Sequence, residues 1–293
     1  MGEVLILGCP INVSEGRSRK VIDEVTSAAG AGANVLDVSS DPDHNRTVIS
    51  LAGNREQIVN GALSAASRAV ELIDLRKHTG VHPRMGAADV IPFTPYRNAS
   101  VDDAVVAART CAERLWDELR VPSFLFERAA FDGEAATLPW VRRHAFKDLP
   151  PSFGGPHPHV TAGASAVGAR EALVAFNVNL KSDDLEAAKS IASALRRGAL
   201  RRRGLRTLGL RLPRRGRVQV STNLTRPDTT TALEVLQAVE DLASRFGIAV
   251  MDTEFVGLVP RLCVGDSDLP LLKAKEPPKI LETVLEKLCR APA

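Results

Sequence analysis

The chain has few aromatic residues and no recognisable pattern of cysteines. Among its 293 residues there are one Tyr and two Trp, so side chains on which nucleic-acid bases could stack are scarce. Its four cysteines include no C-x-x-C pair, and their spacings match no zinc-binding pattern. We therefore expect no nucleic-acid partner and no structural zinc, and we expect buried thiols in a reducing compartment.

Long apolar runs and targeting signals are also absent from the sequence. No stretch approaches the roughly 20 apolar residues that a membrane helix needs, and the N-terminus lacks the features of a signal peptide. The phosphate-binding loop, the dinucleotide-binding glycine pattern and the nucleophile elbow of serine hydrolases are missing as well. These absences predict a soluble, cytoplasmic protein without membrane contact, and they disfavour nucleotide binding and acyl-serine chemistry.

Positive charge is concentrated in one segment. The net charge of the chain is only +3, but residues 196–217 contain ten arginines and no acidic residue. We favour a solvated hairpin whose arginines maintain solubility. An anionic ligand tail, such as a chain of glutamates, is the main alternative, and a nucleic acid is a weaker one.

The apolar patterns predict the same order of elements in both halves of the chain: strand, helix, strand, strand, helix, strand. This is the order of the ferredoxin-like unit, so we expect an α+β fold with two ferredoxin-like subdomains in tandem, residues 1–180 and 181–293, and a ligand site at their seam. A helix cap is expected at Ser182 or Asp183. Residues 132–159 have no clear period and are expected to be mainly loop with a short helix. The expected strands cover 4–7, 34–38, 47–51, 89–93, 123–126, 173–178, 205–212, 218–224 and 248–251. The expected helices cover 18–29, 55–73, 101–119, 185–197, 231–246 and 280–289.

The most informative motif is the run from 78 to 89, which begins with two histidines four residues apart. Pro83 and a nearby glycine stiffen the segment after His82, and an imidazole with a pKa near 6.5 suits proton transfer at neutral pH. His82 is therefore the candidate catalytic residue, and Arg84 is a candidate ligand for a carboxylate. The alternatives are a structural histidine, or a metal site formed by His78 and His82, which the glycine and proline between and after them disfavour.

Two further polar segments are candidate substrate contacts. Asn12 follows the first expected strand, where it either begins a helix or contacts substrate. Asp41, Asp43 and His44 lie between the second and third strands. They form either a plain turn or an acidic lip that orients a cationic amidine or a histidine.

A stiff loop with glycines at both ends covers residues 153–163. Glycines allow a ligand to approach backbone amides closely. His157 and His159 in this loop either bind an anion or face water.

The sequence resembles the formiminotransferase family, whose members move a formimino group between N-formimino-L-glutamate and tetrahydrofolate. The His-Pro-Arg-Met-Gly-Ala run at 82–87 is the most specific match. The resemblance extends in the same order over six segments: 9–16, 45–47, 78–95, 163–180, 219–224 and 256–260.

The resemblance implies two ferredoxin-like subdomains with a folate tunnel between them, tetrahydrofolate as co-substrate, N-formimino-L-glutamate as donor, and no metal. It implies that His82 is the catalytic histidine. Family analogy alone suggests a homodimer. A cyclodeaminase domain follows in vertebrate relatives, and since this chain ends at Ala293, that second activity is expected to be absent. The resemblance also implies a folate-binding loop formed by Gly154, Gly155, Pro156, His157, Pro158, His159, Val160, Thr161, Ala162 and Gly163.

Two residues depart from the vertebrate pattern. Ser39 stands where those relatives have a second acidic residue, and Val81 stands where they have Glu. The choice between formimino transfer and two alternatives therefore stays open at this point. One alternative is formyl transfer from N-formylglutamate, and the other is folate binding without catalysis.

Overall fold

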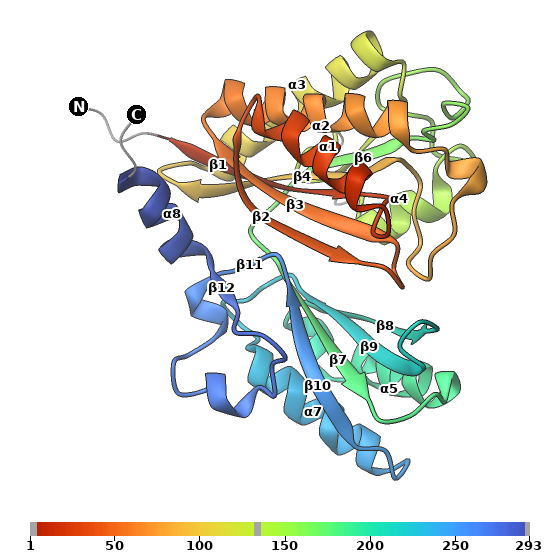
Figure 1. Cartoon of the computed structure of the whole chain (residues 1–293), viewed down its shortest axis with the longest axis vertical. Coiled ribbons are helices and arrows are strands. Elements are labelled where there is room, and N and C mark those ends of the chain that lie inside the picture. Colours follow the sequence, from red (N-terminus) through yellow and green to blue (C-terminus); the bar gives the residue numbers. More distant parts are fainter. Residues whose placement is uncertain (1–4, 132–135, 291–293) are drawn as a thin grey trace. The chain divides into compact units, whose positions relative to one another are not determined.

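Figure 1 presents the computed structural model of the chain, which describes residues 5–131 and 136–290. The chain divides into two compact units, Met1–Glu171 and Ala172–Ala293. Each unit combines helices with a β-sheet, so the expected α+β class is confirmed. Val4 and residues 132–135, which fell within predicted segments, lie outside the described residues. Within the described ranges, no helix has both the length and the apolar character that a membrane span requires.

The first unit has a six-stranded sheet in the order β2-β3-β1-β4-β6-β5. The four strands from β2 to β4 pair antiparallel, whereas β6 pairs parallel with both β4 and β5. The elements are β1 (Ile6–Val13), α1 (Arg19–Gly30), β2 (Asn34–Asp41), β3 (Arg46–Gly53), α2 (Arg55–Leu72), the short 3-10 helix η1 (Leu75–Lys77), β4 (Ala88–Arg97), α3 (Val101–Leu119), β5 (Ser123–Glu127), α4 (Leu138–His144) and β6 (Ser165–Ala169).

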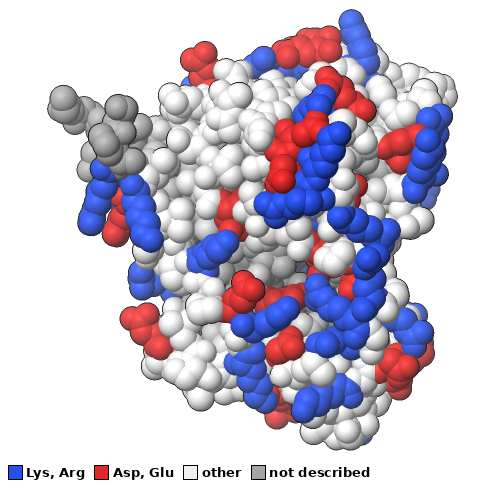
Figure 2. All heavy atoms as spheres, viewed as in Figure 1, with Lys and Arg blue, Asp and Glu red and all other residues white. Residues whose placement is uncertain are grey.

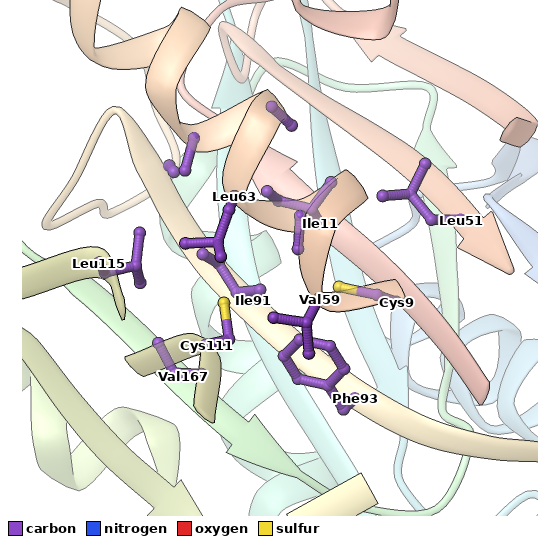
Figure 3. Close-up of a cluster of buried hydrophobic side chains, with 14 of the residues drawn as sticks. Cys9, Ile11, Leu51, Val59, Leu63, Ile91, Phe93, Cys111, Leu115 and Val167 are labelled. Atoms are coloured by element: carbon purple, nitrogen blue, oxygen red, sulfur yellow. The ribbon is translucent and has the colours of Figure 1, made fainter. Parts of the chain in front are cut away.

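Side-chain caps and apolar faces fix the three long helices of this unit. Ser18, Asn54 and Ser100 accept backbone N–H groups at the starts of α1, α2 and α3, and the last two caps are reciprocal capping boxes. The buried faces of α2 and α3 pack on the sheet. Figure 3 shows this core, to which β1, β3, β4, β6, α2 and α3 all contribute side chains.

Two strands run through prolines at which the sequence predicted an end. We expected the first strand to end at residue 7, before Pro10, and the fourth to end at residue 93, stopped by Pro92 and Pro95, but β1 continues to Val13 and β4 continues to Arg97. The pairs Gly8↔Thr94 and Asn12↔Val90 place the two prolines opposite each other. Because both missing N–H donors fall at the same point of the β1–β4 ladder, the interruption stays local.

The second unit has a four-stranded sheet in the order β10-β7-β9-β8, with α5 and α7 packed on one face. The predicted hairpin is confirmed as β8 and β9. The elements are β7 (Val174–Leu180), α5 (Leu185–Arg197), α6 (Ala199–Arg202), β8 (Leu205–Leu212), β9 (Arg217–Leu224), α7 (Ala232–Ser244), β10 (Val250–Val256), β11 (Leu258–Val259), η2 (Arg261–Cys263), η3 (Leu269–Leu271), β12 (Lys279–Ile280) and α8 (Leu281–Arg290).

Two boundaries differ from the predicted ones. The units divide after Glu171, whereas the predicted subdomains divide after residue 180. The difference is β7, which pairs with β9 and β10 of the second unit. The predicted helix cap at Ser182 or Asp183 is wrong, because Asp184 caps α5 by accepting two backbone N–H groups.

The cysteines are buried with one exception. Cys9, Cys111 and Cys263 are buried, as predicted, but Cys289 on α8 is exposed. Burial raises the pKa of the Cys111 thiol to about 12 and that of Cys263 to about 11. These two thiols therefore remain protonated at neutral pH and behave as small apolar side chains.

Several arginines of the segment 196–217 have specific partners. Arg203 pairs with Glu234, Arg215 with Glu254 and Arg217 with Asp252. Figure 2 shows Lys and Arg side chains gathered over the part of the second unit that carries β8 and β9. The segment is therefore partly an ion-pairing element of the fold and not only a solvated surface.

Close packing of α2 against the segment that follows α1 predicts opposite effects for two Gly→Ala substitutions. A Cβ on Gly61 would lie 2.6 Å from the Cβ of Ala33, whereas a Cβ on Gly30 would meet only Val35 at 3.6 Å. We expect Gly61→Ala to lower the free energy of unfolding by about 1–3 kcal/mol. Gly30→Ala should raise that free energy by up to about 1 kcal/mol, because alanine is the better helix former. Urea unfolding of both variants checks this, and equal stabilisation by both would contradict the packing.

Candidate functional site

The His82 segment lies against the turn that joins β2 to β3. The backbone N–H of Val81 donates to the Asp43 carbonyl at 3.2 Å, and the side-chain amide of Asn45 donates to the Thr79 carbonyl at 2.9 Å. Two segments that the sequence analysis singled out separately are therefore neighbours in space. The segment from 78 to 82 forms no helix, as the glycine and proline predicted.

The β2–β3 turn is built by its own aspartate. Oδ1 of Asp41 accepts the backbone N–H groups of Asp43 and His44, each at 2.8 Å, and Asn45 adopts a positive φ of 49°. Asp43, His44 and Asn45 are buried. The turn reading is confirmed for Asp41, and the turn brings the His44 side chain to the His82 loop.

The His82 ring has a defined orientation. It stacks on the His44 ring with centroids 5.7 Å apart and an interplanar angle of 25°. Nδ1 of His82 lies 2.8 Å from the Pro83 carbonyl oxygen. Because a carbonyl can only accept, Nδ1 carries the hydrogen, and in the neutral ring Nε2 keeps the free lone pair. This tautomer presents Nε2 as a base.

A buried carboxylate anchors two arginines near His82. The side chain of Asp89 on β4 is fully buried, with ion pairs to Arg46 of β3 and, at 2.6 Å, to Arg142 of α4. Its other oxygen accepts the Met85 backbone N–H at 2.7 Å. The predicted candidate Asn12 contacts the same cluster, because its Oδ1 accepts a hydrogen bond from Arg46 Nε at 3.0 Å. The cluster carries two positive charges and one negative charge.

These charges set the protonation states at the site. Burial alone would raise the pKa of Asp89, but Arg46 and Arg142 lower it to about 2. Loss of hydration lowers the pKa of His82 well below its usual range, and the positive charges of Arg46 and Arg142 lower it further. The His82 imidazole is therefore neutral at pH 7.

The guanidinium of Arg84 holds the loop together. Its Nη2 donates to the His82 carbonyl at 2.7 Å and to the His44 carbonyl at 3.2 Å, and its Nη1 contacts the His78 ring. Burial lowers the pKa of His78, and the charge of Arg84 lowers it further, so a neutral imidazole accepts from the arginine. In this structure Arg84 links the loop to the β2–β3 turn.

The glycine-flanked loop meets the other end of the His82 segment. The Ala87 N–H donates to the Ala162 carbonyl, and the Ala164 N–H donates to the Met85 carbonyl, both at 2.9 Å. Gly163 has a φ of +71°, and a Cβ there would lie 2.2 Å from the Met85 oxygen. The tip of the loop faces outward, with Val160 75% exposed. The tip also exposes Gly154, Pro156, His157 and Pro158.

The sequence identified the segments of this site but not its ionic core. The structure brings His82, His44 and Arg84 together, with Asp41 and Asp43 in the adjoining turn. Arg142 was missed because it lies in the aperiodic segment that was expected to be mainly loop. The one sequence signal for it is indirect. Asp89 lies in a strand expected to be buried, and a buried carboxylate needs a cationic partner. Among the described residues, no group of three His, Cys, Asp or Glu side chains is placed to hold a metal ion.

The chain matches one protein family over most of its length. Residues 6–170 match the formiminotransferase domain, N-terminal subdomain, and residues 175–269 match the formiminotransferase domain. It is 37% identical over 272 residues to the glutamate formimidoyltransferase of Streptococcus pyogenes, covering 89% of this chain and 91% of that protein. It is 34% identical over 274 residues to the glutamate formimidoyltransferase of Thermoplasma acidophilum, covering 89% and 90%. It is 39% identical over 278 residues to the formimidoyltransferase-cyclodeaminase of Rattus norvegicus, covering 89% of this chain and 51% of that protein.

The buried carboxylate predicts an acid-dependent loss of stability. Asp89→Asn leaves two largely buried cations without their anion, so we expect it to lower the free energy of unfolding at neutral pH by about 3–5 kcal/mol. The folded-state pKa of Asp89 is about 2 and lies below an unfolded value of about 3.9. The stabilisation is therefore complete above the unfolded value and is lost as the pH falls towards 2.

Urea unfolding at neutral pH and at several pH values between about 4 and 2 measures this difference. The exposed Asp102 is the matched control, and Asp102→Asn should leave stability nearly unchanged. A deficit in Asp89→Asn that stays constant down to the lowest pH would contradict the pairing.

Proposed function

The chain belongs to the formiminotransferase family, and we propose that it transfers a formimino group between N-formimino-L-glutamate and N5 of tetrahydrofolate, with His82 as general acid and base. The family membership supports the reaction. The observation that carries the role of His82 is its tautomer, since Nδ1 donates to the Pro83 carbonyl at 2.8 Å and Nε2 is left to exchange protons.

One imidazole can serve both halves of the transfer. N5 of tetrahydrofolate attacks the amidine carbon of the donor, and a tetrahedral centre forms. Nε2 of neutral His82 takes the proton from N5, and the resulting imidazolium gives a proton to the departing glutamate nitrogen. A lowered pKa keeps the base free at pH 7 and makes the imidazolium a strong acid in the second step. Such proton transfer contributes about 10²–10⁴ in rate.

The arginine pair suits the anionic donor. Arg46 and Arg142 share one carboxylate, so their cluster keeps one net positive charge. A carboxylate of N-formimino-L-glutamate is the complementary group, and guanidinium groups bind carboxylates with strong charge-assisted hydrogen bonds. In this assignment Arg84 fixes the loop, and Arg46 and Arg142 attract the donor.

The folate side of the proposal uses the glycine-flanked loop and the second unit. We propose that the exposed part of the loop from 154 to 163 contacts tetrahydrofolate, which the adjacency of this loop to the His82 segment supports. We also propose that both units are ferredoxin-like and contribute to a folate tunnel. The strand orders β4-β1-β3-β2 and β10-β7-β9-β8 support the first part.

A polar sheet face in the second unit supports the tunnel. Alternation along β7 directs Asn177 and Asn179 away from the helices. Asn179 donates to Asp252 at 2.6 Å, and Gln219 donates to Asn179 at 3.0 Å. Buried amide and carboxylate groups on a sheet face are costly unless they are hydrogen-bonded. These groups satisfy one another, and they give the sheet face away from the helices a polar lining that suits a polar ligand.

Loss of the imidazole should abolish most of the turnover. We expect His82→Ala to lower kcat by at least about a hundredfold, while tetrahydrofolate binding, measured by calorimetry, survives. His144, a partly exposed histidine paired with Asp148, provides the control, and His144→Ala should keep nearly full activity. The assay follows product absorbance with N-formimino-L-glutamate and, separately, with N-formylglutamate. Near-normal turnover in His82→Ala would remove the mechanism.

The pH dependence of kcat/KM should depend on the positive charges near His82. Because the base form of His82 is required and its pKa is lowered, the acid limb of kcat/KM should lie below about pH 6.5. Arg142→Gln removes a positive charge that lowers this pKa, so its acid limb should move to higher pH. Arg143, the exposed neighbour on α4, is the control, and Arg143→Gln should leave the limb in place. An acid limb that does not move in Arg142→Gln would refute the electrostatic account.

A further inference from the structure

His159 makes its contacts within its own loop. Its ring Nδ1 accepts the backbone N–H of Ala162 at 3.1 Å and that of Thr161 at 3.3 Å. Its backbone N–H donates to the Gly163 carbonyl at 2.8 Å, and its carbonyl accepts the Gly163 N–H at 2.9 Å. The imidazole therefore fills the inside of a closed five-residue turn and satisfies two amides that would otherwise lack partners.

The residues that this ring organises hold the His82 segment in place. The Thr161 carbonyl accepts the Leu75 N–H at 2.8 Å, and the Ala162 carbonyl accepts the Ala87 N–H at 2.9 Å. Leu75 begins the short helix η1 that leads into the histidine-containing run. Thr161 and Ala162 therefore act on both sides. Their N–H groups bind the His159 ring, and their carbonyls support the two ends of the histidine-containing run.

We propose that His159 is a positioning residue that fixes the glycine-flanked loop against the His82 segment through its Nδ1, and that it is not a contact for the ligand. The inference rests on the proposed function only in that the transfer reaction supplies one of its readouts. It separates two roles within the loop. The exposed residues such as Pro158 and Val160 are available to the folate, and the ring beneath them maintains their conformation.

Two substitutions of His159 test whether the loop needs the hydrogen-bond acceptor Nδ1 or the aromatic ring. Asn carries its Oδ1 on Cγ, where His carries Nδ1, so His159→Asn keeps an acceptor and loses the ring. His159→Phe keeps a ring and loses the acceptor. A residue that stacks on the ligand tolerates Phe better than Asn, whereas a residue that works through Nδ1 tolerates Asn better than Phe.

We expect His159→Phe to lower kcat/KM for tetrahydrofolate by about tenfold or more, because two hydrogen bonds are lost, and His159→Asn to stay within about threefold of the wild type. Amide hydrogen exchange without substrates is the second readout. Exchange at Thr161, Ala162, Leu75 and Ala87 should accelerate in His159→Phe and be nearly normal in His159→Asn, while exchange in β2 and β3 stays unchanged in both.

Three outcomes would overturn the proposal: activity retained in Phe but lost in Asn, activity retained in both, or activity lost in both with normal exchange in Asn. The last would mean that Nε2 contacts the ligand. If the wild-type protein shows no formimino transfer, the proposed function fails. The exchange data on substrate-free protein still decide whether His159 fixes the loop. His159→Ala serves as the second variant if His159→Phe does not fold.

Discussion

A carboxylate with no exposure to water must be compensated by nearby positive charge, and the site is organised around that requirement. Asp89 meets it with Arg46 and Arg142, which come from different elements and pair with the same carboxylate. The three residues tie β3, β4 and α4 to one point. Burial lowers the pKa of His82, and because two cations share one anion, a net positive charge remains beside the ring and lowers this pKa further.

Hydrogen bonds from backbone and side-chain groups hold the loops around this cluster. The β2–β3 turn supports one end of the His82 segment through Asp43 and Asn45. The glycine-flanked loop supports the other end through Ala162. This scaffold fixes the direction of the His82 ring, and a fixed ring direction is what proton transfer to two nitrogens in turn requires. The same contacts explain why glycine is needed at 163, where a side chain would strike a carbonyl.

Elements that depend on local sequence signals were predicted well. Features that depend on pairing between distant residues were not. The helix expected at 101–119 has those bounds in the structure, because Ser100 caps it and apolar residues repeat with the helical period. The first and fourth strands were predicted to end too early, at residues 7 and 93, since the opposition of Pro10 and Pro92 is visible only in the sheet register. β6 was missed because its small residues carry weak strand signals and its pairing partners lie far along the chain.

Pairing between distant residues also limited the prediction of the site. The histidine run and the aspartate-rich turn carried local signals, so their candidates were identified. The pairing of Asp89 with Arg142 spans 53 residues and leaves no local pattern. Nitrogen-15 NMR of the histidine side chains, compared between wild type and His82→Asn, tests the central claim most directly. The account predicts a neutral His82 ring at pH 7 with its hydrogen on Nδ1, titrating below about pH 6.5. A His82 ring that is protonated at pH 7, or that carries its hydrogen on Nε2, would contradict it.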